Sequence, residues 1–161
     1  MSKLQIRMAE EGDLAAVRNL WGQLDRFHHE LGMAFPETKE ADKQWQSSFE
    51  RILGRFSFLW VAELNSKIGA FLLARIKQSP AYLGGLQVGE ISDLFVTEDF
   101  RGQQIAAGLV AEAMLKFDEL KVHSVEVQIQ AGNEAGSEFW KKQGFDLDLS
   151  QVRKVLKGEA Q

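Results

Sequence analysis

Residues 90–109 read EISDLFVTEDFRGQQIAAGL, a strand-forming run followed by a short turn and a helix-forming run. The turn ends at Arg101-Gly102, and the helix begins directly after it. The first backbone N–H groups of a helix have no partner within it, and the helix dipole adds partial positive charge there. Small side chains at Gly102, Ala106 and Ala107 let a ligand approach the backbone. The junction predicts an anion site suited to a pyrophosphate, although any strand–turn–helix junction shares part of this pattern.

Strands and helices alternate along the rest of the chain. Apolar residues alternate in the strands and recur in steps of three and four in the helices. Strands are expected at 4–8, 56–64, 68–76, 88–97, 125–129, 145–149 and 152–156, with a hairpin turn at 65–67. Helices are expected at 13–31, at 103–120, at 133–143 and around a face formed by Trp45, Phe49, Ile52 and Leu53.

This order of elements predicts an α/β (α+β) fold. Strand–helix–strand units in the second half imply some parallel pairing, while the hairpins imply antiparallel pairing. We therefore expect a single domain over residues 1–161, with a mixed, mostly antiparallel sheet of about six to seven strands flanked by about four helices. A chain of 161 residues with 45% hydrophobic residues is long enough to bury one sizeable core, which excludes intrinsic disorder.

Composition excludes several kinds of function. The chain has no cysteine, so a disulfide scaffold, a thiolate zinc site and a cysteine nucleophile are excluded. The net charge of −4 is opposite to the basic field that nucleic-acid binding needs. No apolar run approaches the ~18 residues of a membrane span, and the first residues lack a signal peptide, so we expect a cytoplasmic protein. Adjacent His28 and His29 point about 100° apart on a helix, which argues against a metal site.

Two segments resemble the motifs of the GNAT superfamily of N-acetyltransferases. Motif A of that family reads Leu-aromatic-Val, a short turn, then Arg-x-x-Gly-x-Gly/Ala. Residues 94–96 (LFV) and 101–106 (RGQQIA) fall in register with it. Residues 133–145 (NEAGSEFWKKQGF) resemble motif B, in which Asn is followed by a small residue, an apolar–Tyr pair and a closing Gly-Phe. The order of the other elements also fits, so the resemblance covers essentially the whole chain.

The resemblance implies a site for acetyl-CoA where the fourth and fifth strands splay apart, beside a bulge in the fourth. The pantetheine arm would pair with backbone groups of the fourth strand, and the N–H of Leu94 would act as oxyanion donor. The pyrophosphate would rest on the backbone after the turn, and Asn133 would cap its helix and reach the cofactor. The implied cofactor-binding residues are Leu94, Phe95, Val96, Arg101, Gly102, Gln103, Gln104, Ile105, Ala106 and Asn133.

Two residues depart from the family pattern. Gln104 stands at the middle glycine of motif A. Its side chain need not clash if it points away from the phosphates and the residue is already helical, so we expect binding to survive. Trp140 stands where the family usually has a tyrosine that protonates the leaving CoA thiolate. An indole does not ionise in this range, so Trp140 is not a general acid. The sequence leaves open whether Trp140 slows catalysis or abolishes it.

Glu90 is the expected general base, because some family members carry a glutamate four residues before the position of Leu94. Four is an even number, which places both residues on one face of a regular strand, but the expected bulge blurs that relation. Asp93 is the competing carboxylate. The first two helices of the family build the acceptor pocket, which makes Phe27, His28, Phe35 and Trp45 candidate acceptor contacts, with Tyr82 as a further candidate.

The sequence therefore predicts an acyl-CoA-dependent N-acyltransferase that moves acetyl to a primary amine by direct attack in a ternary complex, since no cysteine is present to carry the acyl group. No metal is expected. One alternative is a noncatalytic acyl-CoA sensor, prompted by Trp140, and another is an enzyme for a longer acyl-CoA. The acceptor, a small-molecule or peptide amine, is not identified. Dimers are common in the family, so a homodimer stays open.

Overall fold

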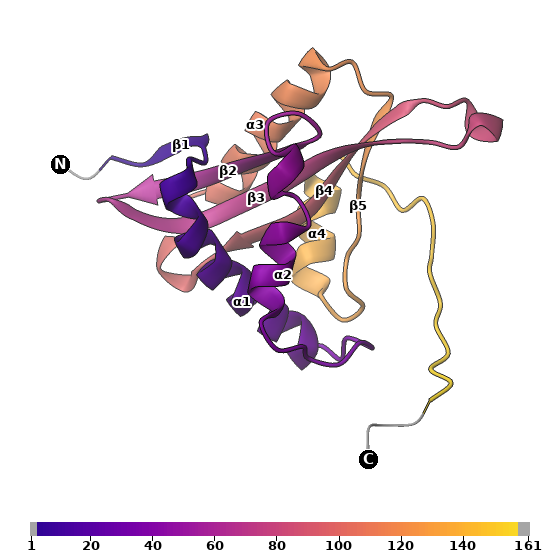
Figure 1. Ribbon diagram of the computed structural model, residues 1–161, viewed down its shortest axis with the longest axis horizontal. Coiled ribbons are helices and arrows are strands. Elements are labelled where there is room, and N and C mark those ends of the chain that lie inside the picture. Colours follow the sequence, from indigo (N-terminus) through magenta and orange to yellow (C-terminus); the bar gives the residue numbers. More distant parts are fainter. Residues whose placement is uncertain (1–2, 158–161) are drawn as a thin grey trace.

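The computed structural model describes residues 3–157, and its centre is one mixed sheet. Within those residues five strands pair in the order β1-β2-β3-β4-β5 (Figure 1). The first four pair antiparallel, and β5 pairs parallel with β4. The strands are β1 (Gln5–Met8), β2 (Ser57–Leu64), β3 (Lys67–Gln78), β4 (Gln87–Val96) and β5 (Ser124–Val127). The sheet is mixed and mostly antiparallel, which confirms the predicted fold class.

Helices cover both faces of the sheet. Figure 1 shows α1 and α2 on one face, with α3 and α4 on the other. The α-helices are α1 (Leu14–Glu30), α2 (Ala41–Ser47), α3 (Ile105–Glu119) and α4 (Glu134–Lys142), and short 3-10 turns are η1 (Glu11–Asp13), η2 (Glu50–Ile52), η3 (Ala81–Leu83) and η4 (Glu98–Phe100). Among the described residues, no helix combines the length and apolar character that a membrane crossing requires.

Two buried clusters follow from the alternation of side chains along β2 and β3. Leu59, Val61, Phe71 and Leu73 point toward α1 and α2, and pack against Val17, Leu20, Leu24 and Phe49. Phe58, Trp60 and Leu72 point the other way, toward Leu109, Ala113 and Phe117 of α3 and Trp140 of α4. The sheet is therefore buried on both faces, and its strands are fixed in register between the two helical layers.

Some element boundaries differ from those expected. The β2–β3 turn holds two residues, Asn65 and Ser66, both with positive φ, because this geometry matches the twist of the flanking strands. The predicted turn was one residue longer. Helix α2 ends at Ser47, and the chain passes through a non-helical Phe49 into η2. The apolar face expected for one helix is thus divided between two short elements.

The last two expected strands, 145–149 and 152–156, do not form in the described part of the chain, so the sheet has five strands rather than six or seven. Residues 145–156 have no regular secondary structure, and Figure 1 shows this yellow segment running away from the sheet. Alternation of apolar residues indicates which face of a strand can be buried, but a strand forms only where a neighbour accepts its hydrogen bonds. Among residues 3–157, no strand pairs with this segment.

Candidate functional site

Strands β4 and β5 stop pairing about halfway along β4. They pair from Val88 with Ser124 to Ile91 with Val127, and beyond that point β4 continues without β5. A bulge lies at the same place, because Ile91 and Asp93 pair with consecutive residues of β3 and leave Ser92 as the extra residue. The bulge expected in the fourth strand is therefore confirmed, and it coincides with the opening between the two strands.

The bulge changes which side chains share a face of β4. Ile91 and Leu94 are three residues apart, yet both pack into the cluster on the α3 side. Asp93 faces the other side, where the Nε1 of Trp45 from α2 donates a hydrogen bond to it. Glu90 precedes Ile91 by one residue and so points to the same side as Asp93. Glu90 and Leu94 therefore lie on opposite faces, despite their even spacing in sequence.

A cavity of about 70 Å³ opens where the strands diverge. Its walls come from α1, the bulge of β4, the chain after β5, and α4. The lining residues are Leu24, His28, Ile91, Ser92, Asp93, Leu94, Val127, Gln128, Ile129, Gln130, Asn133 and Trp140. Four residues chosen from sequence, His28, Leu94, Asn133 and Trp140, are thus brought together around one space.

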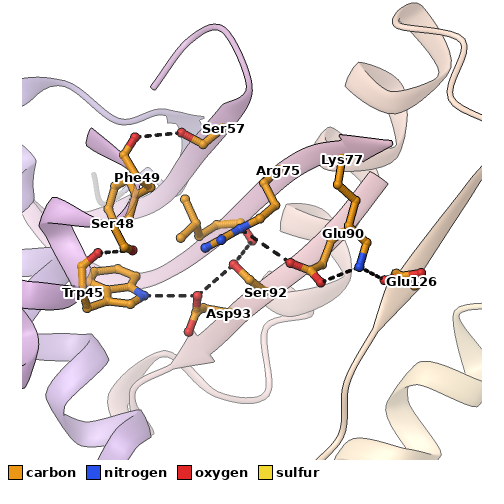
Figure 2. Close-up of polar contacts among 11 residues, drawn as sticks. Trp45, Ser48, Phe49, Ser57, Arg75, Lys77, Glu90, Ser92, Asp93 and Glu126 are labelled. Carbon is orange, nitrogen blue, oxygen red and sulfur yellow. Dashed lines mark hydrogen bonds and ion pairs between the residues drawn. The ribbon is translucent and has the colours of Figure 1, made fainter. Parts of the chain in front are cut away.

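Asp93 is the carboxyl group that lines this cavity. Burial raises the pKa of Asp93, and hydrogen bonds from Ser92 and Trp45 oppose the rise only in part. The Oδ2 atom accepts from the Oγ of Ser92 at 2.9 Å and from the Nε1 of Trp45 at 3.2 Å (Figure 2). Trp45 itself is held by a stacked Trp21, with ring centroids 5.4 Å apart. Asp93 is therefore a fixed, partly buried carboxyl group that binds protons more tightly than an exposed aspartate.

Glu90 lies in a row of charges instead. Its carboxylate is 3.5 Å from the Nε of Arg75 and 3.3 Å from the Nζ of Lys77. Lys77 also pairs with Glu126 of β5, so the row crosses three strands, as Figure 2 shows. Glu90 is not among the described residues that line the cavity. Asp93, the competing carboxylate, therefore lines the cavity together with Leu94, whereas Glu90, the expected base, lies between the side chains of Arg75 and Lys77.

The adjacent histidines have different surroundings. His28 lines the cavity, and burial lowers its pKa against the opposing pull of Asp93 and Asp25. His29 places its Nδ1 2.8 Å from the backbone oxygen of Asp25 and its Nε2 3.1 Å from that of Phe35. A carbonyl oxygen can only accept, so each ring nitrogen must carry a proton to bond it, which favours the protonated ring and raises the pKa of His29. His28 is therefore the one that faces the site as a neutral imidazole.

The start of α3 forms the other end of the site. Helix α3 begins at Ile105, and Gln104 precedes it in the left-handed conformation, with φ of 57°. The expectation that Gln104 is helical is therefore wrong, since this position requires the conformation that glycine adopts most readily. Gly102 also has positive φ, and a Cβ built there would meet open space. Within the described residues, the Gln104 side chain makes no capping bond, so the first N–H groups of α3 are available to an anion.

Helix α4 supplies two more groups. The Oδ1 of Asn133 accepts a hydrogen bond from the backbone N–H of Gly136 at 2.9 Å, which confirms the predicted cap. Trp140 is 8% exposed and packs edge-on against Phe139 and Phe145, with centroids 5.1 and 5.0 Å away. Its ring is thus part of the core as well as of the cavity wall.

The remaining acceptor candidates lie outside the cavity. Phe27 and Phe35 are exposed, and Phe35 lies under the guanidinium of Arg153. Tyr82 is 86% exposed in η3, at the far end of the β3–β4 hairpin. In contrast, Gln128 and Gln130 line the cavity and were missed. Gln128 fell inside the strand expected at 125–129 and Gln130 came directly after it, so the sequence did not mark either residue as part of a site.

Solved structures share this fold at low sequence identity. A tetramutant of the BH1408 protein from Bacillus halodurans matches with 23% identity and a TM-score of 0.81, over 94% of this chain and 99% of that one. A predicted acetyltransferase from Clostridium acetobutylicum, solved with acetyl-CoA, matches with 19% identity and a TM-score of 0.78, over 96% and 97%. An aminoglycoside acetyltransferase from an uncultured soil metagenomic sample, in complex with sisomicin, matches with 18% identity and a TM-score of 0.69, over 96% and 97%.

The solved structures show the fold, and the comparison of sequences shows the family. A search of curated proteins finds no match. The model of the acetyltransferase (GNAT) family matches residues 24–145, which include the cavity, the β4 bulge and the start of α3. A match of that extent, over the segments that build the site, shows that the chain belongs to the GNAT family of acetyltransferases.

Proposed function

We propose that this protein transfers an acetyl group from acetyl-CoA to a primary amine by direct attack, without an acyl-enzyme. The observation that carries the proposal is the cavity at the β4–β5 splay, where a proton-binding carboxyl group, Asp93, lies beside the backbone of Leu94. The acetyl-CoA in the Clostridium acetobutylicum structure supports the choice of donor, and sisomicin, an amine, in the metagenomic enzyme supports the class of acceptor.

The chain supplies two groups for the chemical step. The amine nitrogen forms a C–N bond with the thioester carbonyl carbon, the C–S bond breaks, and the sulfur leaves as a thiolate. Asp93 accepts the proton that the amine loses, directly or through a water, and its raised pKa makes it a stronger base than an exposed aspartate. The N–H of Leu94 stabilises the negative charge that develops on the carbonyl oxygen, a contribution of a few kcal/mol at such sites.

The other residues predicted from the sequence are assigned to the binding of acetyl-CoA, the acetyl donor. Backbone groups from Leu94 to Val96 pair with the pantetheine arm, where β4 has lost its β5 neighbour. The turn from Arg101 to Ala106 holds the pyrophosphate on the open start of α3. Asn133 keeps its side-chain amide nitrogen for the donor, because its oxygen already caps α4.

The cavity favours acetyl over longer acyl groups. Its volume of about 70 Å³ is small beside the roughly 300–1,000 Å³ of pockets that enclose a drug-sized ligand. The buried ring of Trp140 closes one wall. We therefore expect acetyl-CoA to be used faster than thioesters with longer chains, and a competition assay between donors measures this preference.

A noncatalytic acyl-CoA sensor is the second candidate, and Trp140 is the observation that favours it. The indole lies in the cavity wall where a tyrosine would protonate the leaving thiolate, and it has no proton to exchange at neutral pH. A free thiol has a pKa near 8.5, so the thiolate can leave unaided near neutral pH. Acid catalysis typically contributes 10²–10⁴-fold, so its loss is compatible with slow turnover.

The test begins with donor binding. Acetyl-CoA at 100 times its dissociation constant stabilises the folded state by about 2.7 kcal/mol, a rise in melting temperature of roughly 5–10 °C for a chain of this length. NAD serves as the control. The absence of a shift at millimolar acetyl-CoA refutes the proposal. A shift together with no thiol release on any of a broad set of amines identifies the sensor.

Two isosteric variants then decide between the carboxylates. If Asp93 is the base, Asp93→Asn lowers kcat by 10²–10⁴-fold while acetyl-CoA binding is retained, and Glu90→Gln changes kcat only a few-fold. The opposite result assigns the base to Glu90, acting from its ion-paired position. Thiol release under saturating acetyl-CoA measures both, and the thermal shift with acetyl-CoA checks that each variant still binds the donor.

A further inference from the structure

Trp45 lies behind the proposed base and not in the wall of the cavity. Its side chain comes from α2, and it is not among the described residues that line the cavity. Its indole Nε1 lies 3.2 Å from Oδ2 of Asp93, as Figure 2 shows. The sequence made Trp45 a candidate acceptor contact, whereas the structure brings its only polar group against the proposed base.

Aromatic neighbours fix the ring of Trp45. Trp21 of α1 stacks on it with ring centroids 5.4 Å apart, and Phe49 and Phe71 pack edge-on at 4.8 and 5.5 Å. Close packing of such large side chains leaves each ring little freedom to turn. The N–H of Trp45 is therefore held on Asp93, although α2 is only seven residues long.

The two oxygens of Asp93 have different surroundings. Oδ2 accepts from both Nε1 of Trp45 and Oγ of Ser92. Among the described residues, the hydrogen bonds of the Asp93 carboxyl group all end on Oδ2. Because Asp93 lines the cavity, Oδ1 is the oxygen that is left for a group bound there.

The two donors respond differently to a proton on Asp93. Oγ of Ser92 also lies 3.3 Å from the backbone oxygen of Leu73. A hydroxyl has one proton to donate, so Ser92 can turn to that carbonyl when Asp93 is protonated. An indole N–H donates only, and the fixed ring keeps it pointed at Asp93. A hydrogen bond of this kind favours the ionised carboxylate.

We propose that Trp45 is a positioning residue for acetyl transfer: its N–H holds Oδ2 of Asp93 and keeps the carboxyl group ionised, so that Oδ1 receives the proton of the acceptor amine. This inference rests on the proposed function. As the amine nitrogen bonds to the thioester carbon, its N–H bond breaks and the proton passes to Oδ1, directly or through a water. The sulfur leaves with the electron pair of the C–S bond. Trp45 acts only through Asp93, since it lies outside the cavity.

Two charged or titratable side chains from other elements act on Asp93 within the described chain. Burial raises the pKa of Asp93, whereas its hydrogen bonds and the charge of Arg75 on β3 lower it. Burial lowers the pKa of His28 on α1, and attraction to Asp93 opposes that effect. Both side chains are kept in the variants that follow, so a change in the titration of Asp93 reports the loss of the N–H of Trp45.

Carbon-13 NMR of the Asp93 carboxyl group in the full-length protein tests the hydrogen bond, and the signal lost in Asp93→Asn identifies it. Trp45→Phe should raise the pKa of Asp93 by about one to two pH units, which is the effect of losing one hydrogen bond to a charged group. A second variant replaces Trp45 by β-(3-benzothienyl)alanine, which keeps the two fused rings and has sulfur in place of the N–H. We expect the same rise in this variant.

Phe49→Leu is the matched control for packing. Phe49 is 1% exposed and contacts the ring of Trp45, so its replacement loosens that ring and leaves the N–H in place. This variant should melt below the parent protein, while Asp93 should titrate at the pH of the parent. An unchanged titration of Asp93 with the benzothienyl side chain overturns the proposal. An equal rise in Phe49→Leu also overturns it, because packing alone would then control the carboxyl group.

Kinetics decide whether this carboxyl group serves the reaction. Thiol release is measured at saturating acetyl-CoA with ethylamine, sisomicin and a lysine-containing peptide, and the pH dependence of kcat is recorded with the amine that reacts fastest. The acidic limb of kcat should move to higher pH by the same shift as the NMR titration, because the base must be ionised to accept a proton. The dissociation constant of acetyl-CoA should stay unchanged, since Trp45 lies outside the cavity.

Failure of this inference and failure of the proposed function give different results. If kcat is normal and the titration of Asp93 does not respond to Trp45, the inference alone is overturned. If the titration responds and the pH dependence of kcat does not, Asp93 is not the base, which overturns both the role of Trp45 and the assignment of Asp93. A parent protein that binds acetyl-CoA and releases no thiol with any of the three amines overturns the proposed function, and with it any role of Trp45 in transfer.

Discussion

Replacing Gly69 by alanine should disturb the turn that we assign to the pyrophosphate. Gly69 lies on β3 against Phe100, and a Cβ built on it would lie 2.3–2.4 Å from three atoms of that ring. One of the three is Cγ, which lies on the χ2 axis, so a flip of the ring about χ2 does not relieve the contact, and the tight packing around Phe100 opposes a change of χ1. Phe100 is 3% exposed and directly precedes Arg101. The backbone of the turn therefore has to move.

Overpacking of this kind costs about 1–3 kcal/mol. For a chain of this length, 1 kcal/mol lowers the melting temperature by about 2–4 °C, so we expect Gly69→Ala to melt roughly 2–12 °C below the parent protein. Calorimetric titration should also show weaker binding of acetyl-CoA, because the start of α3 shifts with the turn.

The control is Gly22→Ala in α1, where a Cβ would meet nothing within 4 Å. Alanine is the better helix former by about 0.5–1 kcal/mol, so this variant should melt higher and bind acetyl-CoA unchanged. If Gly69→Ala shows the parent melting temperature and the parent affinity, Phe100 does not hold the turn and the reasoning is refuted.

Further predictions concern single groups of the site. Burial raises the pKa of Asp93, so ionisation of this group lowers the stability of the folded state as pH rises above about 3.8. Asp93→Asn should therefore raise the unfolding temperature at pH 7 but not at pH 3. An equal rise at both pH values would contradict this reasoning. NMR titration should place the pKa of His29 above 6.5 and that of His28 below 6.5, and the reverse order would exclude the contacts described. Denaturant unfolding should show Gln104→Gly about 1 kcal/mol more stable than the parent protein, because glycine adopts the left-handed conformation without strain. Asn133→Ala should be about 1 kcal/mol less stable, because the cap of α4 is lost. An unchanged stability of Gln104→Gly would contradict the strain at Gln104, and an unchanged stability of Asn133→Ala would contradict the role of the cap.

Most of the fold was predictable from local patterns. The helix near residues 13–31, the β2–β3 hairpin and the long helix after Arg101 each show their own period over enough residues to be recognised. The unpaired N–H groups at the start of α3 could also be predicted from the sequence, because every helix that follows a turn begins with such groups. The conformation of Gln104 was not, since the sequence shows only that the residue is not glycine, and the tertiary position of the turn imposes the left-handed backbone.

Sequence by itself therefore determined the order of the elements, the family resemblance and the two segments that meet at the site, because each depends on residues close together in the chain. Only the tertiary structure decided which carboxylate lines the cavity. One extra residue, Ser92, reverses the alternation of β4, turning Asp93 toward Trp45 and leaving Glu90 with Arg75. It also decided that the last expected strands do not form, because a strand needs a neighbour that accepts its hydrogen bonds, and residues 145–156 pair with no strand among residues 3–157.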